Sequence, residues 1–375
     1  MKKRYKILGG LVATLVLAIV ASLAYLGHDA PCASAPPPAA DTPTMRAITF
    51  RCYGGPEVLR VETVARPALP DDGVLVRVHA AAANPLDWHY LRGTPYLVRI
   101  DAGIGAPKLP SLGVDFAGTV AAVGKDVTRF KPGEAVFGGR TGAYGEYVVV
   151  RESRAIAMKP GNVSFEQAAS VPIAGVTALQ ALRDKGHLQP GQKVLINGAS
   201  GGVGTFAVQI AKALGAHVTG VCSARNAELV RSLGADEVID YAREDFTRRA
   251  GEYDLIVDMV SSRPLRATVG ALKPGGTLVI VGSLDTGHFL GPLKRDLAAL
   301  LLAPFVSQKL EPILASLDAE DLASLADLMR SGKLTPVIDR RFTLEQVPEA
   351  IRYLESGRAR GKIVISIDED VAPGR

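Results

Sequence analysis

The chain has 375 residues, of which 47% are hydrophobic and 22% charged, and its formal net charge is +5. This composition is typical of a globular protein of about two domains and excludes a predominantly low-complexity chain. Four basic residues (Lys2, Lys3, Arg4 and Lys6) precede the first apolar segment, and no dense basic stripe follows them. The positive balance is therefore a poor argument for nucleic-acid binding, and we expect no such partner.

Residues 7–27 are the first distinctive segment, because none of these 21 residues is charged. A helix rises about 1.5 Å per residue, so this one would span about 30 Å, the thickness of a bilayer's hydrocarbon core. Signal peptides usually have a shorter apolar region of about 7–15 residues. The Ala33-Ser34-Ala35 sequence nevertheless offers a cleavage site as the alternative. We expect residues 1–27 to be an uncleaved membrane anchor and the proline-rich residues 28–44 to be an extended tether.

Three cysteines, Cys32, Cys52 and Cys222, are too few and too widely spaced for a disulfide framework or a cysteine-rich zinc site. No histidine stands at a ligand spacing from any of them. The expectation is three unpaired thiols, of which one or two are buried.

From residue 45 onward, stretches punctuated by glycine and proline predict short strands at 45–54, 73–84 and 145–153. From residue 164 strands and helices alternate. We expect strands at 193–197, 217–222, 237–241, 254–260 and 276–283, helices at 204–215, 226–234 and 319–332, and a last strand at 361–367. Short apolar strands separated by helices indicate a parallel sheet. The order of the regions favours an α/β domain inserted into a β-rich domain that the chain re-enters at its end.

The sequence "VLINGASGGVG", residues 194–204, joins a predicted buried strand to an amphipathic helix. Gly198, Gly201 and Gly204 recur every three residues, and Gly202 stands beside them. Because glycine has no side chain, the backbone can approach a pyrophosphate, whose charge then meets the positive end of the helix. This setting favours a dinucleotide-binding loop over a plain tight turn.

The end of the next strand distinguishes the two nicotinamide dinucleotides. NAD enzymes place an acid there, about 20 residues after the glycine loop, to bind the ribose 2′-hydroxyl. Here "VCSARN" offers Ser223 and Arg225, and no acid precedes Glu228. A hydroxyl and a guanidinium can bind a 2′-phosphate that a carboxylate would repel. The sequence therefore favours NADPH over NADH, with a solvated surface position as the alternative for Arg225.

Further motifs occur in a consistent order along the chain: "NPLDWHYLRG", "LGVDFAGTVAAVG", "GAYGEYVVV", "QAASVPIAGVTALQAL", "SLGADEVIDY" and "ARGKIVI". Together with the glycine loop, they resemble the medium-chain dehydrogenase/reductases over residues 45–367. The resemblance is strongest to the zinc-independent quinone-oxidoreductase branch, close to reticulon-interacting-protein-like NADPH oxidoreductases. It implies an α/β fold in which a GroES-like catalytic domain (45–165, returning at 321–375) is split around a Rossmann NADP-binding domain (166–320). It also implies a homodimer.

The resemblance bears on zinc residue by residue. Zinc-dependent relatives have a cysteine where this chain has Asn84, and a Gly-His-Glu motif at residues 113–115, which read Gly-Val-Asp here. Their third ligand, a cysteine, falls near Ala174. Asn, Val and Ala cannot form a three-ligand zinc site, so we expect no metal. Without a Lewis acid, hydride transfer suits acceptors that delocalise charge themselves, such as quinones and α,β-unsaturated carbonyls.

Three residues are candidates for catalysis. The Asn84 amide could donate to an acceptor oxygen or, alternatively, satisfy the turn before Pro85. His89 or Tyr90 could supply the proton that the reduced acceptor needs, with surface or packing roles as the alternatives. We expect Asp87 to brace this loop.

By resemblance, the cofactor-binding residues form four groups. The pyrophosphate loop is Ser200, Gly201, Gly202, Val203 and Gly204; Ser223, Arg225 and Tyr241 face the 2′-phosphate; Thr177, Gly282 and Ser283 lie near the nicotinamide; Arg360 and Lys362 reach the cofactor from the turn before the last strand. A solvated charged turn is the alternative for the last group. We expect residues 297–306 to pack in the core, with an apolar acceptor pocket or a dimer surface as alternatives.

The leading hypothesis is a zinc-independent, NADPH-dependent reductase of quinones or α,β-unsaturated carbonyls. The alternatives are an alcohol dehydrogenase or aldehyde–ketone reductase, and a membrane-tethered NADPH-binding scaffold with little turnover. A membrane anchor suits a lipid-soluble quinone. Two arguments conflict over the side of the membrane on which the catalytic part lies. The basic residues before the anchor direct the rest of the chain outward, whereas reduced nicotinamide cofactor is normally available in the cytoplasm.

Overall fold

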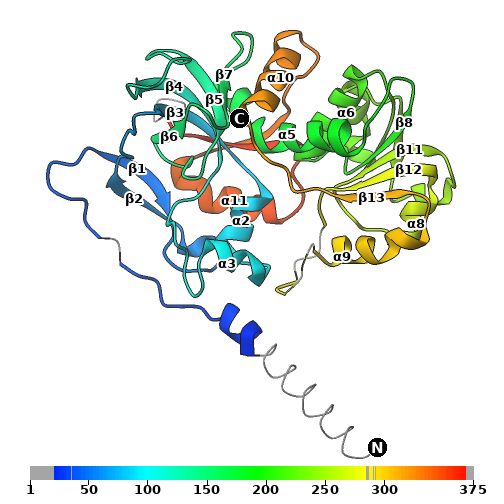
Figure 1. The fold of residues 1–375 in the computed structure, drawn as a ribbon, viewed down its shortest axis with the longest axis horizontal. Helices are drawn as coiled ribbons and strands as arrows, with labels where there is room; N and C mark the ends of the chain where they lie inside the picture. Colours follow the sequence, from blue (N-terminus) through cyan, green and yellow to red (C-terminus); the bar gives the residue numbers. More distant parts are fainter. Residues whose placement is uncertain (1–20, 35, 284–286, 290, 292, 369–375) are drawn as a thin grey trace, which may run out of the picture.

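The computed structural model describes residues 21–368 except 35, 284–286, 290 and 292, and it places the two larger of its three sheets side by side (Figure 1). The strands of the β-rich part are β1 Thr44–Thr49, β2 Arg60–Ala65, β3 Gly73–Ala83, β4 Asp115–Val123, β5 Ala135–Gly139, β6 Tyr147–Arg151, β7 Ile156–Met158, β14 Ile338–Thr343 and β15 Lys362–Ser366. Its helices are α2 Pro85–Arg92, α3 Arg99–Ala102, α4 Phe165–Ala169, α10 Ala319–Arg330 and α11 Val347–Glu355. The last two strands come from the end of the chain, so this part is split in sequence as predicted.

The α/β part contains the strands β8 Lys193–Asn197, β9 His217–Cys222, β10 Glu237–Asp240, β11 Tyr253–Asp258, β12 Leu272–Ile280 and β13 Lys309–Pro312. Its helices are α5 Pro172–Gln180, α6 Gly202–Ala213, α7 Ala227–Ser232, α8 Leu265–Gly270 and α9 Leu293–Leu302. All six strands are parallel, in the order β10-β9-β8-β11-β12-β13. This is the doubly wound Rossmann order, which reverses direction between β8 and β11.

The β-rich sheet runs in the order β14-β15-β3-β4-β5-β7, with β6 also paired to β3. Strand β3 is central because its sequence, Gly-Val-Leu-Val-Arg-Val-His followed by four alanines, buries nearly every residue on both faces. The returning β15 pairs antiparallel with β3, so that Ile363 lies opposite Ala83. This register brings residue 362 to the point where β3 ends.

One hydrophobic core connects the two sheets. It includes Ala80 and Phe137 from the β-rich sheet and Ile196 and Val257 from the parallel sheet. Helix α5 lies between the two sheets in Figure 1 and is buried along most of its length. The two parts are therefore packed against one another rather than joined by a flexible linker.

The predicted anchor falls mainly on residues 1–20, which lie outside the described residues. Within the part of the chain that the structure describes, no helix is both long enough and apolar enough to cross a bilayer. Residues 21–26 are helical, and residue 29 forms a parallel bridge with Gly105 of the β-rich part. The start of the expected tether is thus docked on the protein rather than free.

The expectation of three unpaired thiols is wrong, because Cys32 and Cys52 form a disulfide. Residues 28–32 fold back onto the β-rich part and bring the two Cα atoms to 4.6 Å, whereas sequence spacing says nothing about such a return. Cys222 is the free cysteine and is buried.

The expectation that residues 297–306 pack in the core is also wrong for most of the segment. Ala299 and Leu302 are buried, but Leu300 is 63% exposed, Leu301 76% and Phe305 79%. Helix α9 packs one face against the sheet, and its remaining apolar residues face outward.

Candidate functional site

The glycine loop forms a tight connection between β8 and α6. Gly198 has a φ of +94°, in the left-handed region that favours glycine. A Cβ atom on Gly204 would lie 2.1 Å from the carbonyl oxygen of Gly198, so no larger residue fits there. The backbone N–H groups of the first turn of α6, at Gly202, Val203 and Gly204, have no acceptor within the helix. They form a positive site for a phosphate group.

The predicted 2′-phosphate residues lie on one edge of this loop. The Asn226 amide donates to Ser200 Oγ over 2.9 Å, which connects the segment after β9 to the glycine loop. The N–H of Tyr241 donates to the carbonyl of Cys222, so Tyr241 stands beside the start of the Ser223–Arg225 segment. Arg225 and Tyr241 are exposed. Asn226 Oδ1 is buried without a hydrogen-bond partner among the described residues.

A hydrogen bond between two buried residues, Asn197 and Asp258, joins the ends of β8 and β11, where the strand order reverses. Asn197, the last residue of β8, donates from its amide to Asp258 Oδ1 over 2.8 Å. Asp258 ends β11, and the same oxygen accepts from the backbone N–H of Ser261. Ser261 Oγ in turn donates to the carbonyl of Gly282 over 2.7 Å. The turns after β11 and β12 are thereby fixed relative to one another.

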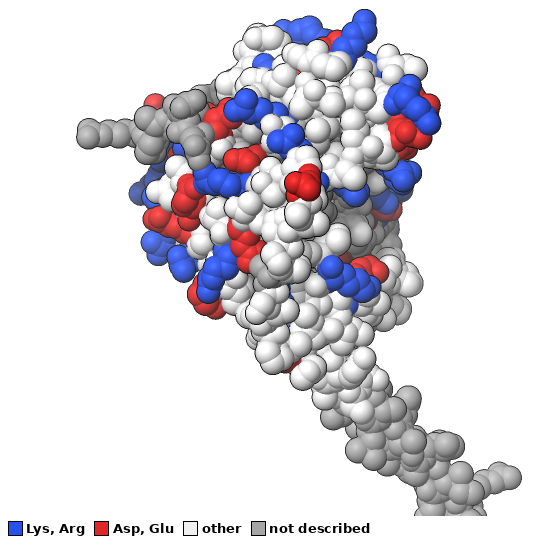
Figure 2. Space-filling view, turned by 90° about the vertical axis from the view of Figure 1, so that its left-hand side faces the viewer, with Lys and Arg blue, Asp and Glu red and all other residues white. Residues whose placement is uncertain are grey.

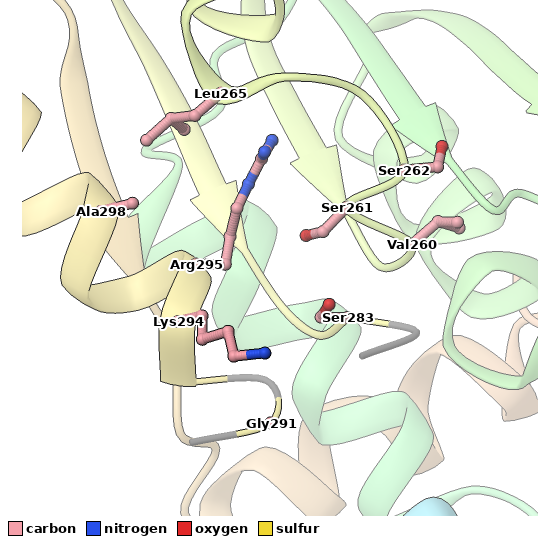
Figure 3. A pocket seen from close by; sticks show the side chains of 9 residues that line it. All are labelled: Val260, Ser261, Ser262, Leu265, Ser283, Gly291, Lys294, Arg295 and Ala298. Carbon is pink, nitrogen blue, oxygen red and sulfur yellow. The ribbon is translucent and has the colours of Figure 1, made fainter. Parts of the chain in front are cut away.

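A cavity of about 490 Å³ opens beside these turns (Figure 3). Ser261 and Ser262 from the turn after β11 line it, with Ser283 from the turn after β12. Lys294 and Arg295 reach it from α9, and Arg295 also forms an ion pair with Asp258. Gly282 and Ser283, predicted to lie near the nicotinamide, therefore stand at the carboxyl edge of the parallel sheet, where ligands bind in such folds.

The most constrained group of the site is a buried cluster of Lys362, Asn84 and Asp115. Lys362 Nζ donates to Asn84 Oδ1 over 2.6 Å and to the carbonyl of Ala83 over 3.1 Å, and it lies 3.4 Å from Asp115 Oδ2. The Asn84 amide donates to the same Asp115 oxygen over 2.9 Å. The other Asp115 oxygen accepts from the N–H of Ile173 in α5. A Cβ atom on Gly202 would lie 3.4 Å from Cδ of Lys362, so the lysine passes beside the glycine loop.

A second buried carboxyl, Asp87, lies next to this cluster. Asp87 Oδ2 accepts from the N–H of Asn84 and from the hydroxyl of Tyr144, each over 2.8 Å. Burial raises the pKa of Asp87 to about 7. Burial also raises the pKa of Asp115 and lowers that of Lys362, with the mutual attraction of the two groups opposing both shifts. Asp87 braces the start of α2.

The three catalytic candidates differ in what their side chains can donate. Both amide hydrogens of Asn84 are used inside the protein, by Asp115 and by the carbonyl of Ala82, so its expected donation to an acceptor is at odds with this geometry. His89 Nδ1 donates to the carbonyl of Thr94 over 2.7 Å, and burial lowers the pKa of the ring. A neutral His89 bonded in this way carries no proton on Nε2, and its role as a proton donor stays a prediction. Tyr90 is 38% exposed.

Two remaining candidates have other partners. The Thr177 hydroxyl donates to the carbonyl of Ile173 in its own helix. Arg360 is exposed, and its backbone N–H donates to Asp339 Oδ2. Lys362, from the same group, is buried rather than solvated, so the alternative of a solvated charged turn holds for Arg360 but not for Lys362.

Three residues that hold the site together, Asp115, Asp258 and Asn226, were not predicted from the sequence to have a role in it. Asp115 had a usable signal, because an acid at the start of the apolar strand β4 must find a partner when buried. Asp258 gave the same signal at the end of β11. Asn226 gave none, since its contact with Ser200 depends on how two loops meet.

In the described ranges, no group of three or more His, Cys, Asp or Glu side chains is placed to hold a metal ion. The positions aligned by resemblance with zinc ligands carry Asn84, Val114 and Ala174. The absence of zinc from the active protein stays a prediction.

Comparison with known proteins defines the class. Residues 70–160 match the alcohol dehydrogenase GroES-like domain, and residues 233–365 match the family described as zinc-binding dehydrogenase. The chain is 35% identical, over 86% of its length, to the chloroplastic quinone-oxidoreductase QR1 of Triphysaria versicolor and covers 98% of that protein. It is 36% identical, over 86% of its length, to the human mitochondrial NAD(P)H oxidoreductase RTN4IP1 and covers 89% of it.

Solved structures agree with these relatives. The quinone oxidoreductase of Coxiella burnetii has a TM-score of 0.77 at 32% identity, with 87% of this chain and all of that chain covered. The Escherichia coli quinone oxidoreductase in complex with NADPH has a TM-score of 0.72 at 28% identity, with 86% of this chain and all of that chain covered. The chain therefore belongs to the medium-chain dehydrogenase/reductases. Within them it belongs to the quinone-oxidoreductase-like branch, and it is an oxidoreductase with a nicotinamide cofactor and a small-molecule substrate.

The raised pKa of Asp87 predicts a pH-dependent stability. Between about pH 4 and 7 the folded chain holds a proton at Asp87 that the unfolded chain releases. The contribution of Asp87 to the free energy of unfolding therefore falls as pH rises through this range, and it stays constant above about pH 7. Its full effect is roughly 4 kcal/mol at one pKa unit per 1.4 kcal/mol. Asp87→Asn should remove this trend, and urea unfolding at intervals from pH 4.5 to 7.5 measures it. Asp327→Asn, at an exposed carboxyl, is the matched control; a wild-type-to-Asp87→Asn difference that stays constant over this range would contradict the raised pKa.

Proposed function

We propose that the chain is an NADPH-dependent reductase of quinones or α,β-unsaturated carbonyls that works without zinc. The observation that carries this proposal is the set of contacts at Asn84. Its position corresponds by resemblance to a zinc-ligating cysteine, and here its amide is bonded to Lys362 on one side and to Asp115 on the other. A side chain with all its hydrogen-bonding groups engaged in this way does not ligate a metal.

The chain's own residues fit NADPH. The N–H groups at the start of α6 suit the pyrophosphate, and the alkyl chain of Lys362 lies beside Gly202. We propose Ser223, Arg225 and Tyr241 for the 2′-phosphate, with no acid in that segment to repel it. We propose the turn at Gly282 and Ser283 for the nicotinamide half, with Thr177 on the neighbouring helix. The same cofactor in the Escherichia coli relative supports this reading.

The bound cofactor supplies a hydride to the acceptor. The protein's part is to hold the acceptor in place and to exclude water. Asn84 acts here as a positioning residue, because Lys362 and Asp115 fix its amide and its N–H fixes Asp87. Among the three catalytic candidates we retain Tyr90 as the proposed proton donor, since His89 has its available proton bonded to Thr94.

We further propose that residues 7–27 anchor the chain uncleaved, and that the chain forms homodimers as relatives of this family do. Cleavage after Ala35 would remove Cys32 and the segment docked beside it, which would leave Cys52 without its partner. A disulfide persists in an oxidising compartment, and the basic residues before the anchor favour the same outward placement. We propose this outward side, which requires that NADPH be supplied there.

The acceptor class is tested by the rate of NADPH oxidation with a panel of quinones, enals and simple aldehydes. We expect turnover with quinones and enals and poor turnover with aldehydes, because the chain offers no Lewis acid to polarise an isolated carbonyl. Dialysis against a zinc chelator should leave the rates unchanged. Faster reduction of aldehydes would favour a carbonyl reductase, and NADPH binding without oxidation by any acceptor would favour a scaffold.

The cofactor assignment is tested by Arg225→Glu. A carboxylate at this position repels the 2′-phosphate, so the ratio of kcat/KM for NADPH over NADH should fall roughly 10- to 100-fold, as for the loss of one or two charge-assisted hydrogen bonds. Arg231→Glu, at an exposed position on α7, is the matched control for charge alone. An unchanged ratio in Arg225→Glu would remove Arg225 from the 2′-phosphate site.

The side of the membrane is tested by trapping thiols in intact cells with a membrane-permeable maleimide and denaturing the full chain without reductant. We expect one labelled cysteine of three, Cys222, because Cys32 and Cys52 are paired. The Cys222→Ser chain should take no label until it is reduced. Labelling of all three cysteines would contradict the outward placement, since cytosolic thiols are kept reduced.

A further inference from the structure

Residues 26–29, where the N-terminal segment meets the β-rich part, are held by one buried arginine. Arg99 is 2% exposed, and its guanidinium donates to the carbonyls of Leu26 and His28 over 3.1 and 2.9 Å. It also forms an ion pair with Asp29 at 2.9 Å. Its Nε donates to the carbonyl of Gly93, just after α2. One side chain thus binds the entering segment to the loop that follows a catalytic helix.

Further contacts fix the same segment. The ring of Tyr96 stacks near the Arg99 guanidinium and leaves no room for a Cβ atom on Gly27. The N–H of Ala30 donates to the carbonyl of Gly105, and the disulfide at Cys32 closes the attachment. The chain therefore leaves the protein in one direction, set by several bonds over seven residues, rather than from a flexible tether.

Exposed apolar side chains surround this exit. On the loop that carries α3, Leu97, Ile100, Ile104 and Leu109 are between 42% and 63% exposed. On α9 and the turn after it, Leu297, Leu300, Leu301 and Phe305 are between 46% and 79% exposed. We call these eight residues the apolar end. Exposed apolar surface of this kind is unusual on a protein surrounded by water and marks an interaction site.

The two halves of the apolar end belong to one side of the molecule. Figure 1 places α3 and α9 at the same lower side, from which the N-terminal segment departs. The N–H of Tyr96 donates to the carbonyl of His288 over 2.7 Å, and its ring meets Phe289 edge-on, which joins the α3 loop to the α/β part just before α9. In Figure 2 the surface around the exit is almost free of charged residues, in contrast to the upper part.

We propose that the apolar end lies on the surface of the bilayer in which residues 7–27 are anchored, and that Arg99 and the Cys32–Cys52 disulfide set this orientation. The proposal rests on the membrane attachment proposed above. The uncharged stretch of sequence that precedes residue 28 is long enough to span a bilayer, and its described end at Leu26 is held on this side of the protein. A lipid surface therefore lies within reach of the leucines of α9, which bury their side chains in it. The acceptor would then enter from the lipid, which selects lipid-soluble quinones or enones.

The test uses the full chain reconstituted in vesicles of phosphatidylcholine with brominated acyl chains, which quench nearby tryptophan. Trp88 is the single tryptophan of the chain and serves as the baseline. Leu301→Trp places a second one on the apolar end, and Met158→Trp places one at a similarly apolar, 41% exposed position on β7, at the opposite side of the molecule. We expect the added emission of Leu301→Trp to be largely lost and that of Met158→Trp to be retained.

Release of the attachment tests its role. In the Leu301→Trp chain, Arg99→Gln combined with Cys32→Ser should restore the emission while the chain still floats with the vesicles. Arg231→Gln combined with Cys222→Ser is the matched control and should leave the quenching intact. Quenching that persists after release would show that the attachment does not set the orientation.

The outcomes distinguish the docked apolar end from the two proposals on which it rests, the membrane attachment and the reductase activity. A chain that floats with the vesicles but shows no quenching at Leu301→Trp overturns the docked apolar end, and a dimer cross-linked through α9 would assign that face to a second copy. A chain that does not float overturns the membrane attachment itself. Neither result affects the oxidation of NADPH, which is measured separately.

Discussion

The ion pair between Lys362 and Asp115, with Asn84 between them, is the interaction on which the rest of the site depends. Its members come from the end of β3, the start of β4 and the start of β15, and Lys362 is separated from Asn84 by 278 positions in sequence. Removing one partner of a buried pair leaves a charge in a medium of low dielectric constant, at a cost of about 3–5 kcal/mol. The pair therefore requires that β15 returns to β3 after the whole α/β part. It also contacts that part directly, since Asp115 accepts from the N–H of Ile173 in α5 and the Lys362 side chain lies beside Gly202 of the glycine loop.

The parts of this arrangement that follow from local sequence were predictable. Strands at 193–197 and 217–222 coincide with β8 and β9, because fully buried strands appear as short apolar runs between glycines. Helix α6 begins at Gly202, two residues before the predicted start, since glycines in its first turn look like loop in the sequence. The glycine loop and the split of the β-rich part were likewise evident from the order of strands, helices and motifs.

The parts that depend on distant segments meeting were not predictable. Nothing in the spacing of Cys32 and Cys52 indicates that residues 28–32 return to the protein, and nothing near His89 indicates that its Nδ1–H donates to the carbonyl of Thr94. Lys362 was expected at the cofactor, and its ammonium group instead points to Asn84 and Asp115 while its alkyl chain borders the loop. The apolar run at 297–306 looks like core because hydrophobicity alone does not distinguish a buried apolar face from an exposed one.

The loop between α2 and α3 connects the entry of the chain to the site. Its residue Thr94 holds His89, its Gly93 carbonyl accepts from Arg99, and Tyr96 reaches His288 beyond the turn after β12. The N-terminal segment is therefore linked to α2 and to the α/β part by a series of hydrogen bonds. With residues 7–27 anchored as proposed, the cavity beside Ser261 and Ser283 has a fixed direction relative to the bilayer. An acceptor confined to lipid then meets the site in fewer orientations than one in solution, which lowers the entropic cost of bringing it to the cofactor.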